Sequence, residues 1–311
     1  MSEVRQDFKM LRKKTEETRF NLVAMMDYAG SGHPGGSLSV LEIMTMLYYG
    51  GVMKYDAAHP KAPDRDRFVL SKGHASPALY VILADLGYFP AEKLKEFDAN
   101  DSMLPKHCNR LKTPGVEAST GALGQGFSMA LGMALAQKMD DINKYNVYCI
   151  LGDGECQSGE VWEAAMAAAK YGLDNLKVIV DNNRLQIDGF TEDVMPLGDL
   201  KAKWEAFGWY VDECDGHDLK ALKEAFRRMD EEAEKGAFPQ VLIANTTKGK
   251  GVSFMEDEAD WHSRKMTKEE GAQALKEVRQ TYEELFNENI DDSILFLNAE
   301  ELEALKGEGG K

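Results

Sequence analysis

The chain has 311 residues, 43% of them hydrophobic and 29% charged, a composition typical of a soluble globular protein with an ample core. Its formal net charge of −16 argues against a nucleic-acid-binding surface, which normally carries a basic patch. No apolar signal region lies near the N-terminus and no segment approaches 18 apolar residues, so we expect no membrane association and a cytoplasmic location. The four cysteines lack C-x-x-C spacing, which favours reduced thiols.

The chain begins with a predicted helix and a glycine-rich segment. Residues 3–29 carry apolar side chains spaced for one helical face. The segment 30–36, Gly-Ser-Gly-His-Pro-Gly-Gly, is expected to end that helix as a loop. Ser37 or Ser39 is expected to cap a second helix that runs to about Tyr49.

A buried strand is predicted next, at residues 68–70, followed by a Ser-Lys-Gly-His loop and a helix that begins near Ser76. Two histidines, His33 and His74, therefore lie in loops, and His74 lies at the carboxyl end of a strand, where open α/β sheets bind ligands. From the local sequence alone, a solvated histidine or one that caps a helix is the simpler interpretation of each.

A second glycine-rich loop, residues 113–126, leads into a helix of small residues that ends near Lys138. Such a loop at a helix N-terminus is a platform for an anion. The sequence contains neither G-x-G-x-x-G at this loop nor a G-x-x-x-x-G-K-[ST] segment, which argues against a dinucleotide fingerprint and a P-loop.

The centre of the chain predicts a strand, a helix and a second strand. Residues 147–151 are apolar and end in Gly152-Asp153-Gly154; an alanine-rich helix is expected over residues 158–171. The run 178–180 then ends in Asp181-Asn182-Asn183. A strand–helix–strand unit implies neighbouring parallel strands, so both polar ends are expected at the same edge of the sheet.

These two strand ends offer a set of oxygen ligands. Asp153 provides a carboxylate, Asn183 an amide oxygen, and the main chain just beyond can add a carbonyl. Such a set suits Mg²⁺ or Ca²⁺, and Mg²⁺ often completes its shell with phosphates and water. Either segment alone fits an ordinary turn, but the pair separated by one crossover is more specific and predicts a metal–diphosphate site.

The C-terminal part predicts a helix at 199–207, a strand at 209–211, a helix at 218–234 and a strand at 239–247. His217 is interpreted as a structural residue in the N-terminal turn of the 218–234 helix. Lys248-Gly249-Lys250-Gly251 follows the last strand, His262 lies shortly beyond, and residues 267–287 predict an amphipathic helix. The order of elements predicts an α/β fold with a doubly wound, mainly parallel sheet flanked by helices.

Six of these motifs, in order over about residues 5–265, resemble the N-terminal, diphosphate-binding half of the transketolase family. They are Ser-Gly-His-Pro-Gly-Gly (31–36), Arg-Phe-x-Leu-Ser-x-Gly-His-Ala (67–75), the Pro-Gly to Gly-Gln-Gly run (114–126), Gly-Asp-Gly, Asn-Asn, and Lys-Gly-x-Gly followed by a histidine. Residues 105–109 read Pro-Lys-His-Cys-Asn where the family usually has Gly-His-Pro. Ser158 stands where a glutamate is common, whereas Glu163 matches the family's nearby interface glutamate.

The resemblance implies a thiamine diphosphate cofactor and Mg²⁺, with Ca²⁺ or Mn²⁺ as alternative ions. Asp153, Asn183 and the carbonyl of Leu185 are the implied metal ligands. The implied cofactor-binding residues are His74, Gly121, Ala122, Leu123, Asp153, Gly154, Glu155, Asn183 and His262. Four histidines are the implied catalytic residues: His33 and His262 for substrate oxygens, and His74 and His107 near the thiazolium and diphosphate.

The implied activity is transfer of a two-carbon ketol unit from a ketose, expected to be a sugar phosphate of the pentose phosphate type, to an aldose. The family's pyrimidine-binding half is missing from this sequence, so a separate C-terminal subunit is expected, with two copies of each chain in a heterotetramer. Residues 1–265 are expected to form the cofactor-binding domain and 266–311 a helical extension. A non-catalytic subunit with this fold, a nucleotide-binding α/β protein and half of an enzyme like deoxyxylulose-phosphate synthase are the alternatives.

Overall fold

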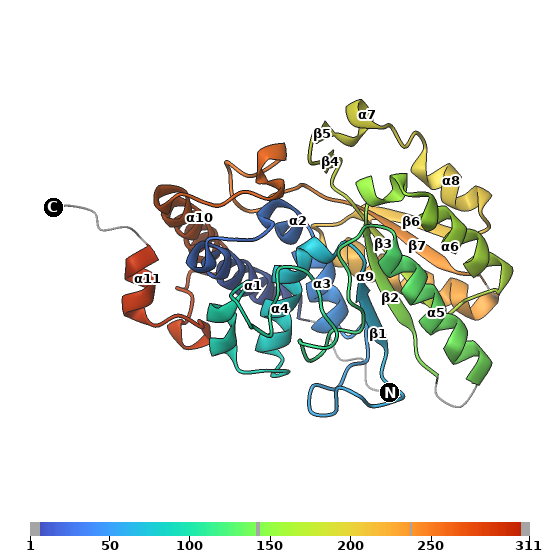
Figure 1. Ribbon diagram of the computed structural model, residues 1–311, viewed down its shortest axis with the longest axis horizontal. Coiled ribbons are helices and arrows are strands. Elements are labelled where there is room, and N and C mark those ends of the chain that lie inside the picture. Colours follow the sequence, from blue (N-terminus) through green and yellow to red (C-terminus); the bar gives the residue numbers. More distant parts are fainter. Residues whose placement is uncertain (1–6, 141–143, 237, 306–311) are drawn as a thin grey trace.

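A five-stranded parallel sheet lies between two layers of helices in the computed structural model, which describes residues 7–140, 144–236 and 238–305 (Figure 1). The strand order is β1-β2-β3-β7-β6, and every neighbouring pair is parallel. The strands are β1 (Arg67–Leu70), β2 (Val147–Gly152), β3 (Leu176–Asn182), β6 (Tyr210–Asp215) and β7 (Gln240–Asn245). The predicted α/β fold with a doubly wound parallel sheet is therefore confirmed.

Alternate residues of each strand enter different hydrophobic clusters, because successive side chains of a strand point to opposite faces of the sheet. In β1, Phe68 and Leu70 join the cluster on one face and Val69 joins the cluster on the other. Both faces are covered, which explains why the strands read as continuous apolar runs rather than as alternating ones.

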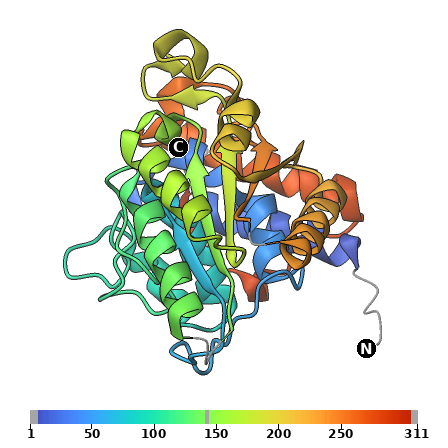
Figure 2. The ribbon, with the colours of Figure 1, turned by 90° about the vertical axis from the view of Figure 1, so that its right-hand side faces the viewer.

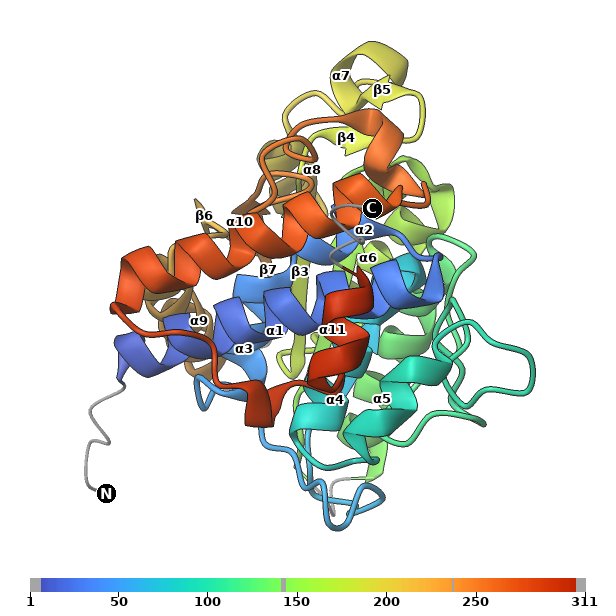
Figure 3. The ribbon, with the colours of Figure 1, turned by 90° about the vertical axis from the view of Figure 1, so that its left-hand side faces the viewer.

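The helices divide between the two faces, as Figure 2 shows. One layer contains α5 (Gln125–Asp140), α6 (Gly159–Lys170) and α8 (Leu200–Ala206). The other contains α1 (Phe8–Ala29), α3 (Leu41–Tyr48), α4 (Ser76–Asp85) and α9 (Leu219–Lys235). Outside this second layer, α10 (Lys268–Phe286) runs alongside α1, and α11 (Ala299–Leu305) lies beside them (Figure 3).

The segment after α1 differs from the sequence expectation. The helix ends at Gly30, whose φ of 60° is the left-handed conformation that closes helices. The glycine-rich segment is not a loop throughout, because Pro34 occupies the first turn of a short helix, α2 (Pro34–Leu38). The prediction that Ser37 or Ser39 caps the helix running to about Tyr49 was wrong: that helix is α3, its N-cap is Val40, and the Ser39 hydroxyl donates to Asp181 instead.

Two further features frame the carboxyl edge of the sheet. A small hairpin, β4 (Leu185–Gln186) and β5 (Gly189–Phe190), precedes α7 (Thr191–Val194) and projects beyond β3 (Figure 1). At the other end of the chain, Thr267 and Glu270 form a capping box that starts α10, and Val278 of this helix is fully buried against α1. The division of the chain at residue 265 remains a prediction. Within the described residues, no helix is long and apolar enough to cross a bilayer.

Candidate active site

The loops at the carboxyl ends of β1, β2, β3 and β7 surround a cavity of about 210 Å³. Its lining combines oxygen ligands, two lysines and two histidines. The lining residues are Gly36, Lys72, His74, Leu123, Gly152, Asp153, Gly154, Glu155, Gln157, Asn183, Leu185, Gln186, Ile187, Asp188, Lys248 and His262. The cavity therefore lies at the carboxyl edge of the sheet, where the sequence predicted a metal–diphosphate site.

Asp153 lies at the wall of this cavity, directly after β2, and only 3% of its surface is exposed. Its Oδ1 accepts a hydrogen bond from the Gly154 amide at 2.8 Å, and its Oδ2 accepts one from the Thr191 hydroxyl at 3.1 Å. Burial, followed by the negative charge of Asp181, raises the pKa of Asp153 to about 6. A bound cation would relieve this unfavourable burial of negative charge.

Asn183 and Leu185 supply the other two predicted ligand oxygens. The Asn183 Oδ1 accepts from the Leu185 amide at 3.1 Å, and the Leu185 carbonyl faces Lys248 Nζ at 3.0 Å. Between them Arg184 has a φ of 62°, a left-handed conformation that is uncommon for a residue with a side chain and turns the main chain sharply here. Such outliers are often found where a ligand site constrains the backbone.

The three oxygens fit a magnesium ion better than a transition metal. The described residues contain no group of three or more histidines, cysteines and carboxylates that could hold a metal. One carboxylate with an amide and a main-chain oxygen is the hard, incomplete donor set that Mg²⁺ accepts when phosphate oxygens supply further ligands. The residues present therefore fit a metal that arrives together with a diphosphate.

Asp181, whose side chain is fully buried, organises this edge of the sheet and was not predicted as a site residue. Its carboxylate accepts hydrogen bonds from four residues in four segments: Ser39, Lys72, Asn183 and Thr246. Burial alone would raise the pKa of Asp181, but the Lys72 ammonium beside it holds that pKa below its usual value. A clue was available in the sequence, since Asp181 directly precedes Asn-Asn at the end of an apolar strand.

Two lysines that the motifs did not single out, Lys72 and Lys248, also line the cavity, and each is 1% exposed. Lys72 pairs with Asp181, whereas Lys248 has no carboxylate partner among the residues that the structure describes. Burial, followed by the charge of Lys72, lowers the pKa of Lys248 to about 8. Two buried ammonium groups make the cavity favourable for an anion, although the chain as a whole is acidic.

The four predicted histidines converge on one place. The ring centroid of His33 lies 5.4 Å from that of His74, 5.3 Å from that of His107 and 5.8 Å from that of His262. His74 and His262 are 5.1 Å apart and line the cavity, whereas His33 and His107 extend the group beyond its lining. Residues from four distant parts of the sequence thus form one histidine cluster.

Each histidine of this cluster has a pKa below its ordinary value, and burial is the first cause in every case. The pKa of His33 falls to about 4 and that of His262 to about 3, with neighbouring histidines and lysines adding repulsion. The rings are therefore neutral near pH 7 and can both accept and donate hydrogen bonds to sugar hydroxyls. One buried atom, His33 Nδ1, has no hydrogen-bond partner in the described structure.

The remaining predicted residues divide between the cavity and its support. Gly154 and Leu123 line the cavity, while Gly121 and Ala122 do not. Gly121 has a φ of 155°, and a Cβ there would lie 3.1 Å from the His107 ring, so a glycine permits this close approach. Glu155 lines the cavity but is 2% exposed, and its carboxylate accepts from the Ser71 hydroxyl and from the main-chain amides of residues 124 and 152.

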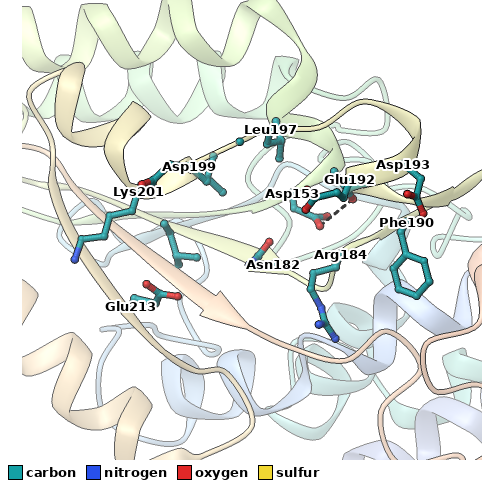
Figure 4. Close-up of a pocket in the computed structure, with 14 residues that line it drawn as sticks. Asp153, Asn182, Arg184, Phe190, Glu192, Asp193, Leu197, Asp199, Lys201 and Glu213 are labelled. Atoms are coloured by element: carbon teal, nitrogen blue, oxygen red, sulfur yellow. Dashed lines mark hydrogen bonds between the residues drawn. The ribbon is translucent and has the colours of Figure 1, made fainter.

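Asp153 also lines a second, larger cavity of about 590 Å³ (Figure 4). Figure 4 shows Arg184 and Asn182 below Asp153, and the acidic residues Glu192 and Asp193 beside it. Asp153 thus belongs to the lining of both cavities.

The profile of the family described as "Transketolase, thiamine diphosphate binding domain" matches residues 11–291. The chain belongs to the transketolase family. Its matched region contains the whole cavity and the histidine cluster, and corresponds to the diphosphate-binding half of transketolase that the six motifs indicated.

Curated relatives named as parts of transketolases are similar to the chain over most of their own length. A 6-deoxy-6-sulfo-D-fructose transketolase subunit from Clostridium sp. (strain MSTE9) is 46% identical over 80% of this chain and 89% of the relative. An apulose-4-phosphate transketolase subunit from Phocaeicola vulgatus is 44% identical over 90% of this chain and 97% of the relative.

Solved transketolases share the fold but are longer chains. The structure from Campylobacter jejuni has a TM-score of 0.81 and 31% identity, and the match covers 96% of this chain and 47% of that one. For the Leishmania mexicana transketolase the TM-score is 0.82, with 28% identity, 95% of this chain and 44% of that one. The chain thus spans less than half the length of these solved transketolases.

His107 joins the histidine cluster although residues 105–109 depart from the family sequence. The Tyr80 hydroxyl donates to the Pro105 carbonyl at 2.8 Å, and the Ser76 hydroxyl donates to the Lys106 carbonyl at 2.6 Å. The Thr120 amide donates a hydrogen bond to the Cys108 carbonyl at 3.1 Å. Side chains and main chain from the neighbouring segments therefore fix this loop so that His107 reaches the histidine cluster.

Proposed function

We propose that this protein is the diphosphate-binding subunit of a two-chain transketolase, which transfers a two-carbon ketol unit from a ketose to an aldose. The observation that supports it is the convergence at one sheet edge of two buried lysines, three ligand oxygens and four neutral histidines. A pocket with these groups is suited to a metal diphosphate on one side and to a polyhydroxylated substrate on the other.

Thiamine diphosphate, when bound, supplies the carbanion chemistry, and the protein contributes position and electrostatics. Asp153, Asn183 and the Leu185 carbonyl would hold Mg²⁺, while Lys72 and Lys248 balance the remaining negative charge of the diphosphate. The glycine at 154 leaves room for the approach of the anion.

His33 and His262 are our candidates for the residues that bind and exchange protons with substrate oxygens. We assign His74 and His107 to oxygens near the thiazolium and diphosphate; His262 lines the cavity beside His74, so it can contact the diphosphate as well. Because burial keeps these rings neutral, each can donate one hydrogen bond to a substrate hydroxyl group and accept another.

The proposal includes a partner. The relatives that match over nearly their whole length are named as subunits, which supports a separate pyrimidine-binding chain for this protein. We expect two copies of each chain, sugars or sugar phosphates as substrates, a role in pentose phosphate-type metabolism and a cytoplasmic location. The described cysteines are all free thiols, as expected in that compartment.

Ketol transfer by the purified chain, with and without its co-expressed partner, tests this function. Thiamine diphosphate, Mg²⁺, a ketose phosphate donor and an aldose acceptor are supplied in both assays. The chain alone should be inactive and should bind the cofactor weakly, because it holds only the diphosphate end. The pair should gain tight cofactor binding and turnover together. Appreciable turnover by the chain alone would contradict the two-chain enzyme, and cofactor binding without turnover by the pair would favour a non-catalytic subunit.

A further inference from the structure

His217 lies outside the cavity with its side chain 13% exposed, and both of its ring nitrogens are engaged. Its Nε2 accepts a hydrogen bond from the main-chain amide of Thr247 at 2.8 Å, and its Nδ1 lies 3.0 Å from Glu42 Oε2. An amide can only donate, so Nε2 carries no proton and Nδ1–H donates to Glu42. Asp218, not His217, caps α9, so the expected role in that helix turn belongs to the neighbouring residue.

Glu42 is held in turn by Arg19 of α1. Its Oε1 accepts from Arg19 at 2.6 Å, and Arg19 also pairs with Glu16. These side chains are at most 2% exposed. Burial alone would raise the pKa of Glu42, but Arg19 and then the His217 hydrogen bond bring it down to about 2. Glu42 therefore stays ionised near neutral pH and keeps the His217 ring oriented.

Such a buried ionic group contributes little net stability, because desolvation offsets much of the attraction between its charges. Here the ionic group instead fixes the position of the main chain at Thr247. Thr247 is the residue before Lys248, and Lys248 Nζ contacts the Leu185 carbonyl at 3.0 Å and His262 Nδ1 at 2.9 Å.

The loop that carries Lys248 is held from several sides. The Thr246 hydroxyl donates to Asp181, and the Gly249 amide donates to the Gly35 carbonyl at 3.0 Å. At Gly251, where φ is 92°, a Cβ would lie 2.5 Å from Arg19 Cδ, so the loop packs directly on the Arg19 side chain. The Thr247 amide is the contact that joins this loop to His217 and Glu42.

We propose that His217, oriented by Glu42, is a positioning residue for the active site: it fixes the main chain at Thr247 and thereby sets where Lys248 reaches into the cofactor cavity. The inference rests on the proposed function, since it assigns His217 a part in cofactor binding without contact with the cofactor. It also extends that function to a residue that the motifs do not include.

Two variants of His217 separate positioning from bulk stability. His217→Leu keeps an apolar side chain in the site but removes both hydrogen bonds, whereas His217→Gln retains one donor and one acceptor. Hydrogen exchange of the full chain without cofactor should show the Thr247 amide exchanging roughly threefold to tenfold faster in His217→Leu, as loss of one hydrogen bond predicts. His217→Gln should stay within about threefold of wild type.

Cofactor binding provides the second measurement. Titration of thiamine diphosphate with Mg²⁺ into the chain and its partner should show about tenfold weaker binding for His217→Leu, the scale found for outer-shell partners of metal sites. His217→Gln should restore most of it. Val147→Ala is the matched control, because Val147 is fully buried at the opposite, amino end of β2 and its truncation lowers stability without touching this loop.

Unchanged Thr247 exchange in His217→Leu, or a loss of cofactor affinity no larger than in Val147→Ala, would overturn the proposal. If His217→Leu does not fold, His217→Asn replaces it, since the shorter amide cannot span both partners. Absence of cofactor binding in the wild-type pair would instead contradict the proposed function, and the exchange measurement, made without cofactor, would still decide the role of His217 in the loop.

Discussion

Lys248 Nζ donates a hydrogen bond to the carbonyl of Leu185 at a distance of 3.0 Å. That carbonyl is the main-chain oxygen proposed as a metal ligand, so an ammonium group and a divalent ion would share one acceptor. A carbonyl oxygen has two lone pairs and can serve both. Lys248 therefore holds the ligand main chain in place and adds positive charge for a diphosphate.

Replacement of Lys248 by methionine should weaken binding of thiamine diphosphate with Mg²⁺ by about tenfold or more, because a charge-assisted hydrogen bond contributes roughly 1.5–3 kcal/mol. Isothermal titration of the chain with its partner measures this. Lys250→Met is the control, since Lys250 lies two residues on and pairs with Glu256 at the surface. Tighter Mg²⁺ binding in Lys248→Met would show that the ammonium competes with the metal instead.

Asp153→Asn should reduce cofactor affinity by about tenfold or more, because it removes the only charged ligand from the proposed metal site. Thr191→Val removes the hydroxyl that bonds the same carboxylate and should change the affinity by less than about threefold. Titration of Mg²⁺ at saturating thiamine diphosphate distinguishes the two. Equal affinities for wild type and Asp153→Asn would mean that the metal lies elsewhere.

The low pKa of His33 predicts a specific dependence of stability on pH. In the folded protein this pKa is about 4, below the ordinary value of 6.5, so the unfolded chain binds the proton first as the pH falls. The neutral His33 ring therefore lowers the free energy of unfolding as the pH drops below about 6.5. The shift in pKa makes this loss about 2 kcal/mol at pH 5.

His33→Gln lacks the titrating ring, so its free energy of unfolding should gain on that of wild type by up to about 2 kcal/mol between pH 7 and pH 5. Urea unfolding at the two pH values measures the difference. A difference between the two proteins that does not vary with pH would show that the ring is not held neutral by burial.

The left-handed conformation of Arg184 gives a test that concerns the backbone alone. Glycine adopts a φ of 62° without steric cost, so Arg184→Gly should be more stable than Arg184→Ala by about 1 kcal/mol. Both variants lose the exposed side chain and its long contact with Asp257 equally. Thermal unfolding should rank glycine above alanine, and the reverse order would mean that the turn relaxes when the side chain is removed.

Much of this arrangement could be predicted from local sequence. Apolar runs that end in Gly-Asp-Gly and Asn-Asn predict two parallel strands with their polar ends at one edge, and β2 and β3 confirm it. The four histidines were expected near one cofactor from the family resemblance rather than from the local sequence, and the rings of the other three lie within 6 Å of His33. Those expectations rest on strand direction and on motifs that each occupy only a few consecutive residues.

What the sequence did not show depends on contacts between distant segments. Lys72 and Lys248 carry an ordinary surface residue type, and only the packing of three loops makes them 1% exposed. The start of α2 at Pro34 was missed because the glycine content outweighed the preference of proline for a first helical turn. The contact of His217 with Thr247 joins residues that are 30 positions apart, which no local pattern indicates.

The long-range hydrogen bonds of the Asp181 carboxylate limit the order of events in folding. Its hydrogen bonds to Ser39, Lys72 and Thr246 span 142, 109 and 65 residues, so the closing of very large loops must precede them. The cofactor cavity is consequently complete only when nearly the whole chain has folded. A ligand that recognises this cavity cannot guide the early steps of folding. It can only bind the folded protein and stabilise it against unfolding by mass action.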